Sequence, residues 1–188
     1  ILKGSRVFKS HKILTSLTAD QLKSALSQAL ERIKKEFPLI DGVIICSVVP
    51  KALKTVRLEV KKYFRLKPLV IGEDIKVPIK NNYRNPRQVG QDRLVCAYAV
   101  KCLYGCPAIV IDFGTATTFD VISKQGSYEG GIIVPGLRLS AESLFAKTAM
   151  LPRLEEFKSP SSLIGKDTKG SILSGLFYGY GAMSRGLI

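Results

Sequence analysis

Apolar and polar positions follow two different periods along this chain, and the change between them lies near residue 107. Before that point, apolar residues spaced three and four apart predict helices, and short apolar runs between them predict strands. The first helix follows Thr18, which forms a predicted capping box with Gln21. Two more helices are predicted from Pro50 to about Phe64 and from about Arg87 to Tyr104. The predicted strands are 6–14, 43–49 and 68–71, and the second is apolar enough to be buried on both faces.

After residue 107 the pattern changes to strands that are separated by short turns. Strands are predicted over 108–112, 117–122 and 128–134, and their close spacing is typical of antiparallel hairpins. Helices are predicted over 137–149 and 171–188. We expect their large apolar residues to form core: Leu137, Leu139, Leu144, Phe145, Met150, Leu173, Leu176, Phe177 and Met183. This order of elements predicts an α/β protein with two lobes, residues 1–106 and residues 107–188.

The composition is that of a globular protein, because 46% of the residues are apolar and 23% are charged. No uncharged stretch reaches the roughly 18 apolar residues that a membrane-spanning helix needs. The four cysteines are too few for a disulfide scaffold in a chain of 188 residues. We therefore expect them to be reduced and buried in a cytoplasmic protein that has no membrane partner.

The net charge of +14 is concentrated in the first half of the chain, where residues 1–94 contain 20 Lys and Arg against 8 Asp and Glu. Such a basic half is compatible with nucleic acid, an anionic membrane surface or an anionic small substrate. Few of these basic residues lie next to aromatic residues, so the sequence predicts no platform for base stacking. We expect a solvated basic face, and nucleic-acid binding stays open as an alternative.

The segment Asp112-Phe113-Gly114-Thr115-Ala116-Thr117-Thr118 connects two predicted strands and could bind a phosphate. Neither of the two common nucleotide motifs, GxxxxGK[ST] and GxGxxG, is present. Gly114 would let a ligand approach the backbone, threonine hydroxyls would donate to anionic oxygens, and Asp112 would attract a cation. An ordinary β-turn between β-branched strand residues explains the same segment without a ligand.

A second polar segment, Gly90-Gln91-Asp92-Arg93, lies in the first turns of the third predicted helix, after a loop that contains Tyr83. A carboxylate beside a guanidinium could activate a hydroxyl group and bind an anionic substrate. A helix cap with a surface ion pair would use the same residue types.

Together these segments resemble the type III pantothenate kinases, a group that includes the Bvg accessory factor homologues. The resemblance covers about residues 43–188. It is carried by 47–50 (SVVP), Tyr83, 90–93 (GQDR), 112–118 (DFGTATT), 130–136 (GGIIVPG), 147–152 (KTAMLP), 164–168 (IGKDT) and 174–175 (SG).

The resemblance implies a two-lobed actin-like, ribonuclease H-like fold and ATP-dependent phosphorylation of pantothenate, the first step of coenzyme A synthesis. It implies that Asp92 accepts the proton of the pantothenate hydroxyl. The residues that it places at pantothenate are Tyr83, Gly90, Gln91, Asp92, Arg93 and Thr168. It also implies that Gly114 and Thr115 contact ATP, that Asp112 binds a monovalent cation (potassium or ammonium), that Mg²⁺ accompanies ATP, and that the protein is a homodimer.

One family motif is missing from this sequence. Members of the family begin with a strand and an Asp-x-Gly-Asn-Thr loop that binds the ATP phosphates and helps to hold Mg²⁺. Nothing before Arg6 matches it, because Lys3-Gly4-Ser5 contains no Asp. We expect that the sequence begins after this loop and ends inside the second lobe, so that both lobes are incomplete. A member that has lost the loop, or a non-catalytic regulatory or nucleotide-sensing relative, is the alternative.

Overall fold

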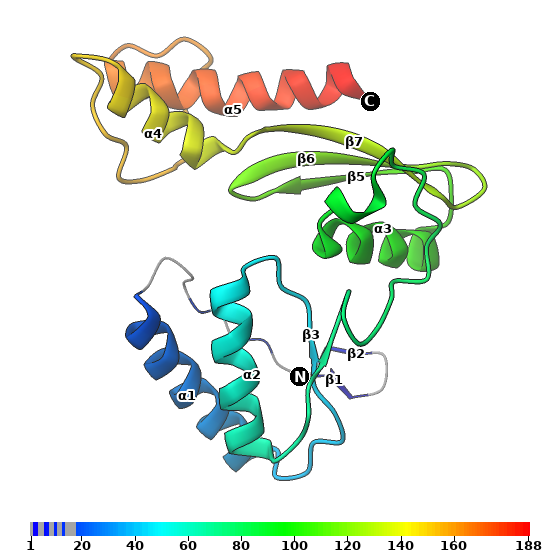
Figure 1. Ribbon diagram of the computed structural model, residues 1–188. Helices are drawn as coiled ribbons and strands as arrows, with labels where there is room; N and C mark the ends of the chain where they lie inside the picture. Colours follow the sequence, from blue (N-terminus) through cyan, green and yellow to red (C-terminus); the bar gives the residue numbers. More distant parts are fainter. Residues whose placement is uncertain (1, 4–5, 8–9, 11–12, 14–17) are drawn as a thin grey trace. The chain divides into compact units, whose positions relative to one another are not determined.

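The computed structural model describes residues 2–3, 6–7, 10, 13 and 18–188. It is a mixed α/β structure with parallel and antiparallel sheets (Figure 1). The chain divides into two compact units, each described by itself below: unit 1 is Ile1–Pro78 with Arg87–Val95, and unit 2 is Ile79–Pro86 with Cys96–Ile188. The predicted lobe boundary near residue 107 stays a prediction.

Unit 1 is built around two packed helices, α1 (Ala19–Glu36) and α2 (Pro50–Phe64). The predicted capping box at the start of α1 is confirmed, because the Thr18 and Gln21 side chains each accept from the other residue's backbone N–H. Between the helices the Ser27 hydroxyl donates to the buried Glu59 carboxylate over 2.7 Å. The other elements are β1 (Leu2–Lys3), β2 (Arg6–Val7), β3 (Ile44–Ile45) and β4 (Leu69–Val70).

The prediction that 43–49 is a strand buried on both faces is wrong. Within 43–49 only Ile44–Ile45 is a strand, and among the described residues it pairs with β4 alone, in a two-stranded parallel sheet. Successive side chains of a strand point to opposite faces. Ile45 is buried and Ile44 is 63% exposed, so only one face of this short sheet is covered. Most of the predicted strand 6–14 lies outside the described residues, as do Gly4 and Ser5.

Unit 2 contains the antiparallel sheet predicted from the second half of the sequence (Figure 1). Its strands are β5 (Ala108–Phe113), β6 (Ala116–Ile122) and β7 (Tyr128–Pro135), in the order β5-β6-β7. The central strand is the most buried, and Phe119 and Ile122 are almost completely shielded from water. The three predicted strands and their hairpin connections are confirmed to within one residue at each end.

Two helices follow the sheet in unit 2, α4 (Leu137–Lys147) and α5 (Thr168–Leu187). The Ser140 hydroxyl lies 2.7 Å from the Tyr180 hydroxyl, which also bonds to the Pro135 carbonyl and so joins α5 to the end of β7. The predicted core of these helices is only partly confirmed. Leu176 is buried, but four of the nine residues are exposed: Leu139, Leu144, Phe145 and Met150.

The third predicted helix is divided into a 3-10 turn, η1 (Pro86–Gln88), and α3 (Gln91–Tyr104). The prediction that Gly90 lies inside the helix is therefore wrong, because α3 begins one residue later. No helix in the described part of the chain is long and apolar enough to span a membrane.

The cysteines also differ from expectation. None of the four forms a disulfide, as predicted, but Cys46, Cys96 and Cys102 are exposed rather than buried. On α3 a hydrogen bond with Cys102 raises the pKa of the Tyr98 phenol, one turn earlier on the helix.

Candidate functional site

The start of α3 holds four of the predicted site residues in unit 1. Asp92 is exposed, and its Oδ1 accepts from the Arg93 backbone N–H over 2.9 Å. A Cβ atom on Gly90 would overlap Asp92 Oδ1 and would lie 3.6 Å from Val48, so the carboxylate rests over the bare glycine backbone. Arg93 lies one position further, with its Nη2 atom shielded from solvent. A carboxylate that can accept a proton and a cationic residue thus occupy consecutive positions at a helix N-terminus.

Gln91 contacts the turn that follows β4. Gly72 in this turn has a φ of +91°, and a Cβ there would lie 2.7 Å from Gln91 Cγ, so a side chain at position 72 would displace Gln91. Because a positive φ also disfavours other residues, position 72 requires glycine for two independent reasons.

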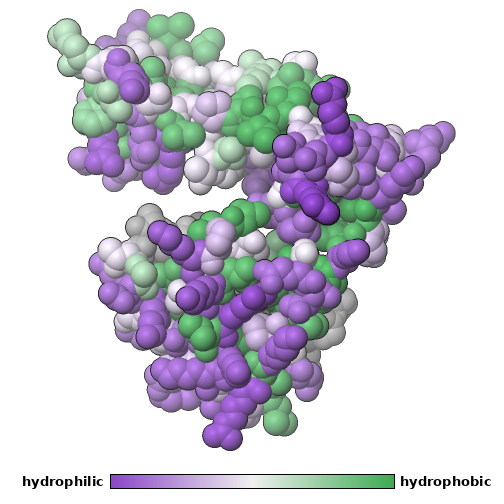
Figure 2. Space-filling model, in the orientation of Figure 1, coloured by the Kyte–Doolittle hydropathy of each residue, from purple (hydrophilic) through white to green (hydrophobic). Residues whose placement is uncertain are grey.

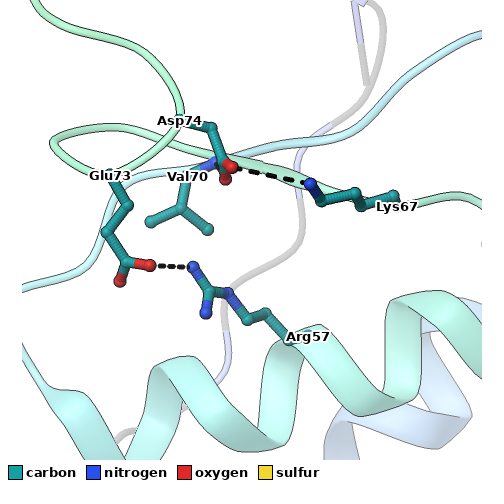
Figure 3. Close-up of polar contacts among 5 residues, drawn as sticks. All are labelled: Arg57, Lys67, Val70, Glu73 and Asp74. Carbon is teal, nitrogen blue, oxygen red and sulfur yellow. Dashed lines mark hydrogen bonds and ion pairs between the residues drawn. The ribbon is translucent and has the colours of Figure 1, made fainter.

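Polar contacts fix this turn (Figure 3). Asp74 Oδ2 accepts from the Val70 backbone N–H over 2.9 Å, and Asp74 Oδ1 lies 3.8 Å from Lys67 Nζ. Arg57 on α2 forms an ion pair with Glu73. These contacts join the turn both to β4 and to α2, and so hold the surface against which Gln91 lies.

In unit 2, the hairpin between β5 and β6 is fixed at its tip by the start of α4. The Gly114 N–H donates to the Ala116 carbonyl over 3.1 Å, and the Gly136 N–H donates to the Thr115 carbonyl over 2.9 Å. A Cβ on Gly136 would overlap the carbonyl oxygens of Gly114 and Thr115. Gly136 is the N-cap of α4 and supplies no side-chain capping bond. The N-terminus of a helix, which favours anions, therefore lies beside the glycine-containing hairpin.

Asp112 lies near the end of β5 and is exposed. Among the described residues, no three His, Cys, Asp or Glu side chains gather as a multidentate metal site. One carboxylate with nearby hydroxyl and carbonyl oxygens fits a singly charged cation. It also fits Mg²⁺ that arrives with a nucleotide, because Mg²⁺ takes most of its ligands from phosphate and water in such sites.

Tyr83 lies in a loop that runs along β7. The Tyr128 N–H donates to the Lys80 carbonyl over 2.8 Å, and the Asn82 N–H donates to the Tyr128 carbonyl over 2.9 Å. The Tyr83 ring lies 3.4 Å from the position of a Cβ on Gly130, whose φ is +125°. A Cβ there would be in ordinary van der Waals contact with the ring, so the positive φ, and not lack of space, is what favours glycine at position 130.

Thr168 is the first residue of α5 and is exposed. Asp167 precedes it as the N-cap and accepts from the Gly170 N–H over 2.7 Å. A Cβ on Gly165 would overlap the backbone of Ser171, so the preceding loop lies closely on the first turn of the helix.

Within each unit, the structure brings some of the predicted residues together. Gly90 to Arg93 form one group in unit 1, and Asp112, Gly114 and Thr115 form a second in unit 2. Tyr83 and Thr168 also belong to unit 2. Sequence reasoning missed Gly72 and the role of Gly136, although a glycine between a strand and a helix was a signal for the second.

A family model described as type III pantothenate kinase matches residues 1–188, the whole chain. The match therefore covers both units and all of the predicted site residues. It also includes residues 1–42, which lie before the segments that carry the resemblance in the sequence.

Proposed function

Because this chain belongs to the type III pantothenate kinase family, we propose that it transfers the γ-phosphoryl group of ATP to the primary hydroxyl of pantothenate. The product is 4′-phosphopantothenate, and the reaction is the first step of coenzyme A synthesis. The family match over the whole chain carries this proposal. We further propose that the fold is the two-lobed actin-like fold of that family, and that the protein works in the cytoplasm.

Asp92 is the proposed proton acceptor. Phosphoryl transfer proceeds in most analyses through a loose transition state, so the protein mainly positions the reactants and neutralises charge. Asp92 would orient the pantothenate hydroxyl and take its proton as the bond to phosphorus forms. The bare backbone of Gly90 supports this role, since it leaves the space that the Asp92 carboxylate occupies.

The other residues at the start of α3 would bind pantothenate. Arg93 offers a planar, permanently charged group that suits the pantothenate carboxylate or the transferred phosphoryl group. Gln91, held against Gly72, would donate or accept hydrogen bonds along the pantothenate amide. Tyr83 and Thr168 complete the proposed pantothenate site.

The hairpin and the start of α4 would bind the ATP phosphates. Gly114 and Thr115 are held by Gly136, so the exposed backbone of the hairpin and the helix N-terminus act on the same anion. Mg²⁺ and a monovalent cation, when bound, would neutralise phosphate charge, with Asp112 as the protein ligand of the monovalent cation.

The test is ADP release from ATP in potassium buffer with and without pantothenate, measured on residues 1–188 and on the complete gene product. We expect pantothenate-dependent release from the complete gene product. Pantothenate binding without ADP release would instead support a non-catalytic regulatory relative.

A further inference from the structure

A buried carboxylate on β6 has no part in the roles proposed above. Asp120 is 1% exposed and accepts two hydrogen bonds, from the Tyr128 hydroxyl to Oδ1 over 2.7 Å and from the Thr118 hydroxyl to Oδ2 over 3.3 Å. Burying a carboxylate is costly unless it is hydrogen-bonded in this way. The arrangement links the interior of the sheet to the hairpin that carries Asp112.

The strand register places Thr118 between two carboxylates. Alternation along β6 puts Thr118 and Asp120 on the same face of the sheet. Asp112 on β5 is the direct partner of Thr118. Directly paired residues have Cβ atoms about 4.5–5.5 Å apart on a shared face. Thr118 therefore has buried Asp120 as its neighbour along β6 and exposed Asp112 as its neighbour across the sheet on β5.

The hydrogen bond to Asp120 determines whether the Thr118 hydroxyl can donate to, or only accept from, a second partner. A hydroxyl has one proton to donate and two lone pairs that accept. Since its proton is directed to Asp120, the lone pairs of Thr118 Oγ1 remain for a partner near Asp112. Asp112 has only acceptor oxygens when ionised, so the partner that suits both groups is a hard cation with oxygen ligands.

We propose that Thr118 Oγ1 is a second protein ligand, beside Asp112, of the monovalent cation, and that Asp120 is the positioning residue that turns the hydroxyl proton away from this cation. The inference rests on the proposed function, from which it takes the cation. Asp120 would not touch the cation. Its effect would pass through one hydrogen bond, as in metal sites where a neighbouring carboxylate orients a ligand.

Four variants test the inference. The control is at the neighbouring threonine of the same strand. Thr118→Val removes the oxygen ligand, Thr118→Ser keeps it, and Asp120→Asn places an amide where the carboxylate accepts the proton. The control is Thr117→Val. Thr117 points to the opposite face, is completely buried, and its hydroxyl has no hydrogen-bond partner among the described residues.

Potassium is titrated against choline chloride at constant ionic strength, with two readouts. One is the half-saturating potassium concentration for pantothenate-dependent ADP release, and the other is the potassium-dependent rise in unfolding temperature. We expect Thr118→Val and Asp120→Asn to raise the half-saturating concentration about tenfold to a hundredfold, the usual effect of changing such a supporting group. Thr117→Val should match the wild type, and Thr118→Ser, which keeps the oxygen ligand, should raise the half-saturating concentration much less than Thr118→Val.

Equal potassium responses of Thr118→Val and Thr117→Val in an active kinase would overturn the inference and leave the proposed function intact. If the wild type releases no ADP, the proposed function fails. The cation site is then tested by the potassium-dependent rise in unfolding temperature alone. The inference would also be overturned if the wild type showed no potassium-specific response in either readout. If Asp120→Asn fails to fold, the comparison of Thr118→Val with Thr117→Val tests the inference without it.

Discussion

At the scale of single residues, the candidate site depends on glycines as much as on charged groups. Gly90, Gly114 and Gly136 leave space that a side chain would fill, and each lies against a residue with a proposed role. Asp92 has its carboxylate over Gly90 and at the N-terminus of α3, where a negative charge interacts well with the helix dipole. The residues with proposed roles therefore depend on the glycines beside them, which leave the space that these residues occupy.

Replacing Asp92 tests the proposed proton acceptor. Asp92→Asn keeps the size and one acceptor oxygen of the side chain but cannot take a proton. We expect kcat to fall by about a hundredfold to ten-thousandfold, the range for general bases, with pantothenate binding preserved. Asp41→Asn, at an exposed position in unit 1, is the matched control and should leave kcat unchanged. Equal kcat values for the two variants would exclude Asp92 from the chemical step.

Replacing Gly136 tests the contact between hairpin and helix. A methyl group there would overlap the Gly114 and Thr115 carbonyls and displace the hairpin. We expect kcat/KM for ATP to fall by about a hundredfold in Gly136→Ala, because a shift of about 1 Å can cost that much. Gly179→Ala on α5 has nothing within 4 Å of the added atom. Steady-state kinetics should show no loss in this control, and an equal loss would exclude the proposed contact.

Sequence motifs predicted the charged residues of the candidate site. They did not predict the residues that contact and position those charged residues. Asp92 and Asp112 stand out because each is a carboxylate two residues from a glycine in a polar segment, a pattern that suggests chemistry. Asp120 does not stand out in the sequence. Only the β5–β6 register shows that it shares a face of the sheet with Thr118 and with Asp112, the partner of Thr118 on β5. Gly72 and Gln91 are distant in the chain and meet only through the turn after β4.

At the scale of elements, helix starts position several proposed functional groups. α3 begins at Gln91, α4 follows Gly136, and α5 begins at Thr168 after the cap residue Asp167. The cap sets where the helix starts, because its side chain satisfies a backbone N–H that has no partner inside the helix.

The cap of α5 gives a test at this scale. Asp167→Ala removes the acceptor for the Gly170 N–H and should lower the free energy of unfolding by about 1 kcal/mol. We also expect a higher KM for pantothenate, since the change loosens the turn that carries Thr168. Asp167→Asn, which keeps a capping oxygen, serves as the control in urea unfolding and kinetics. An Asp167→Ala variant as stable as Asp167→Asn would contradict the role of the cap.

Helices and hairpins were predictable from sequence because they depend on nearby residues. The capping box of Thr18 and Gln21 and the close strands of unit 2 are of this kind. The apolar run 43–49 was misread because burial depends on what covers each face of a sheet. In the structure β3 has one paired neighbour, and Ile44 remains exposed.

At the scale of the whole molecule, the exposed apolar residues on α4 and just after it are the main departure from the predicted core. Figure 2 shows hydrophobic residues, among hydrophilic ones, at the surface over α4 and α5. Phe145 is 46% exposed and Met150 is 91% exposed. The family resemblance implies a homodimer, and we propose that a second copy covers this surface.

The proposed dimer can be tested with one charge. Phe145→Glu places a carboxylate on the apolar surface, and burial of an unpaired charge would oppose association. We expect the wild type to be a dimer by light scattering and Phe145→Glu to be a monomer. Leu39→Glu, at an 89% exposed position in unit 1, should stay dimeric. A dimeric Phe145→Glu variant would show that the interface lies elsewhere.

The central claim is that this chain is a kinase that acts on pantothenate, and the product tests it most directly. The complete gene product is incubated with ATP, Mg²⁺, potassium and pantothenate, and the small molecules are identified by mass spectrometry. We expect 4′-phosphopantothenate and ADP in equal amounts, and neither product when pantothenate is omitted. ADP without phosphorylated pantothenate, or pantothenate that binds and is recovered unchanged, would contradict the proposed function.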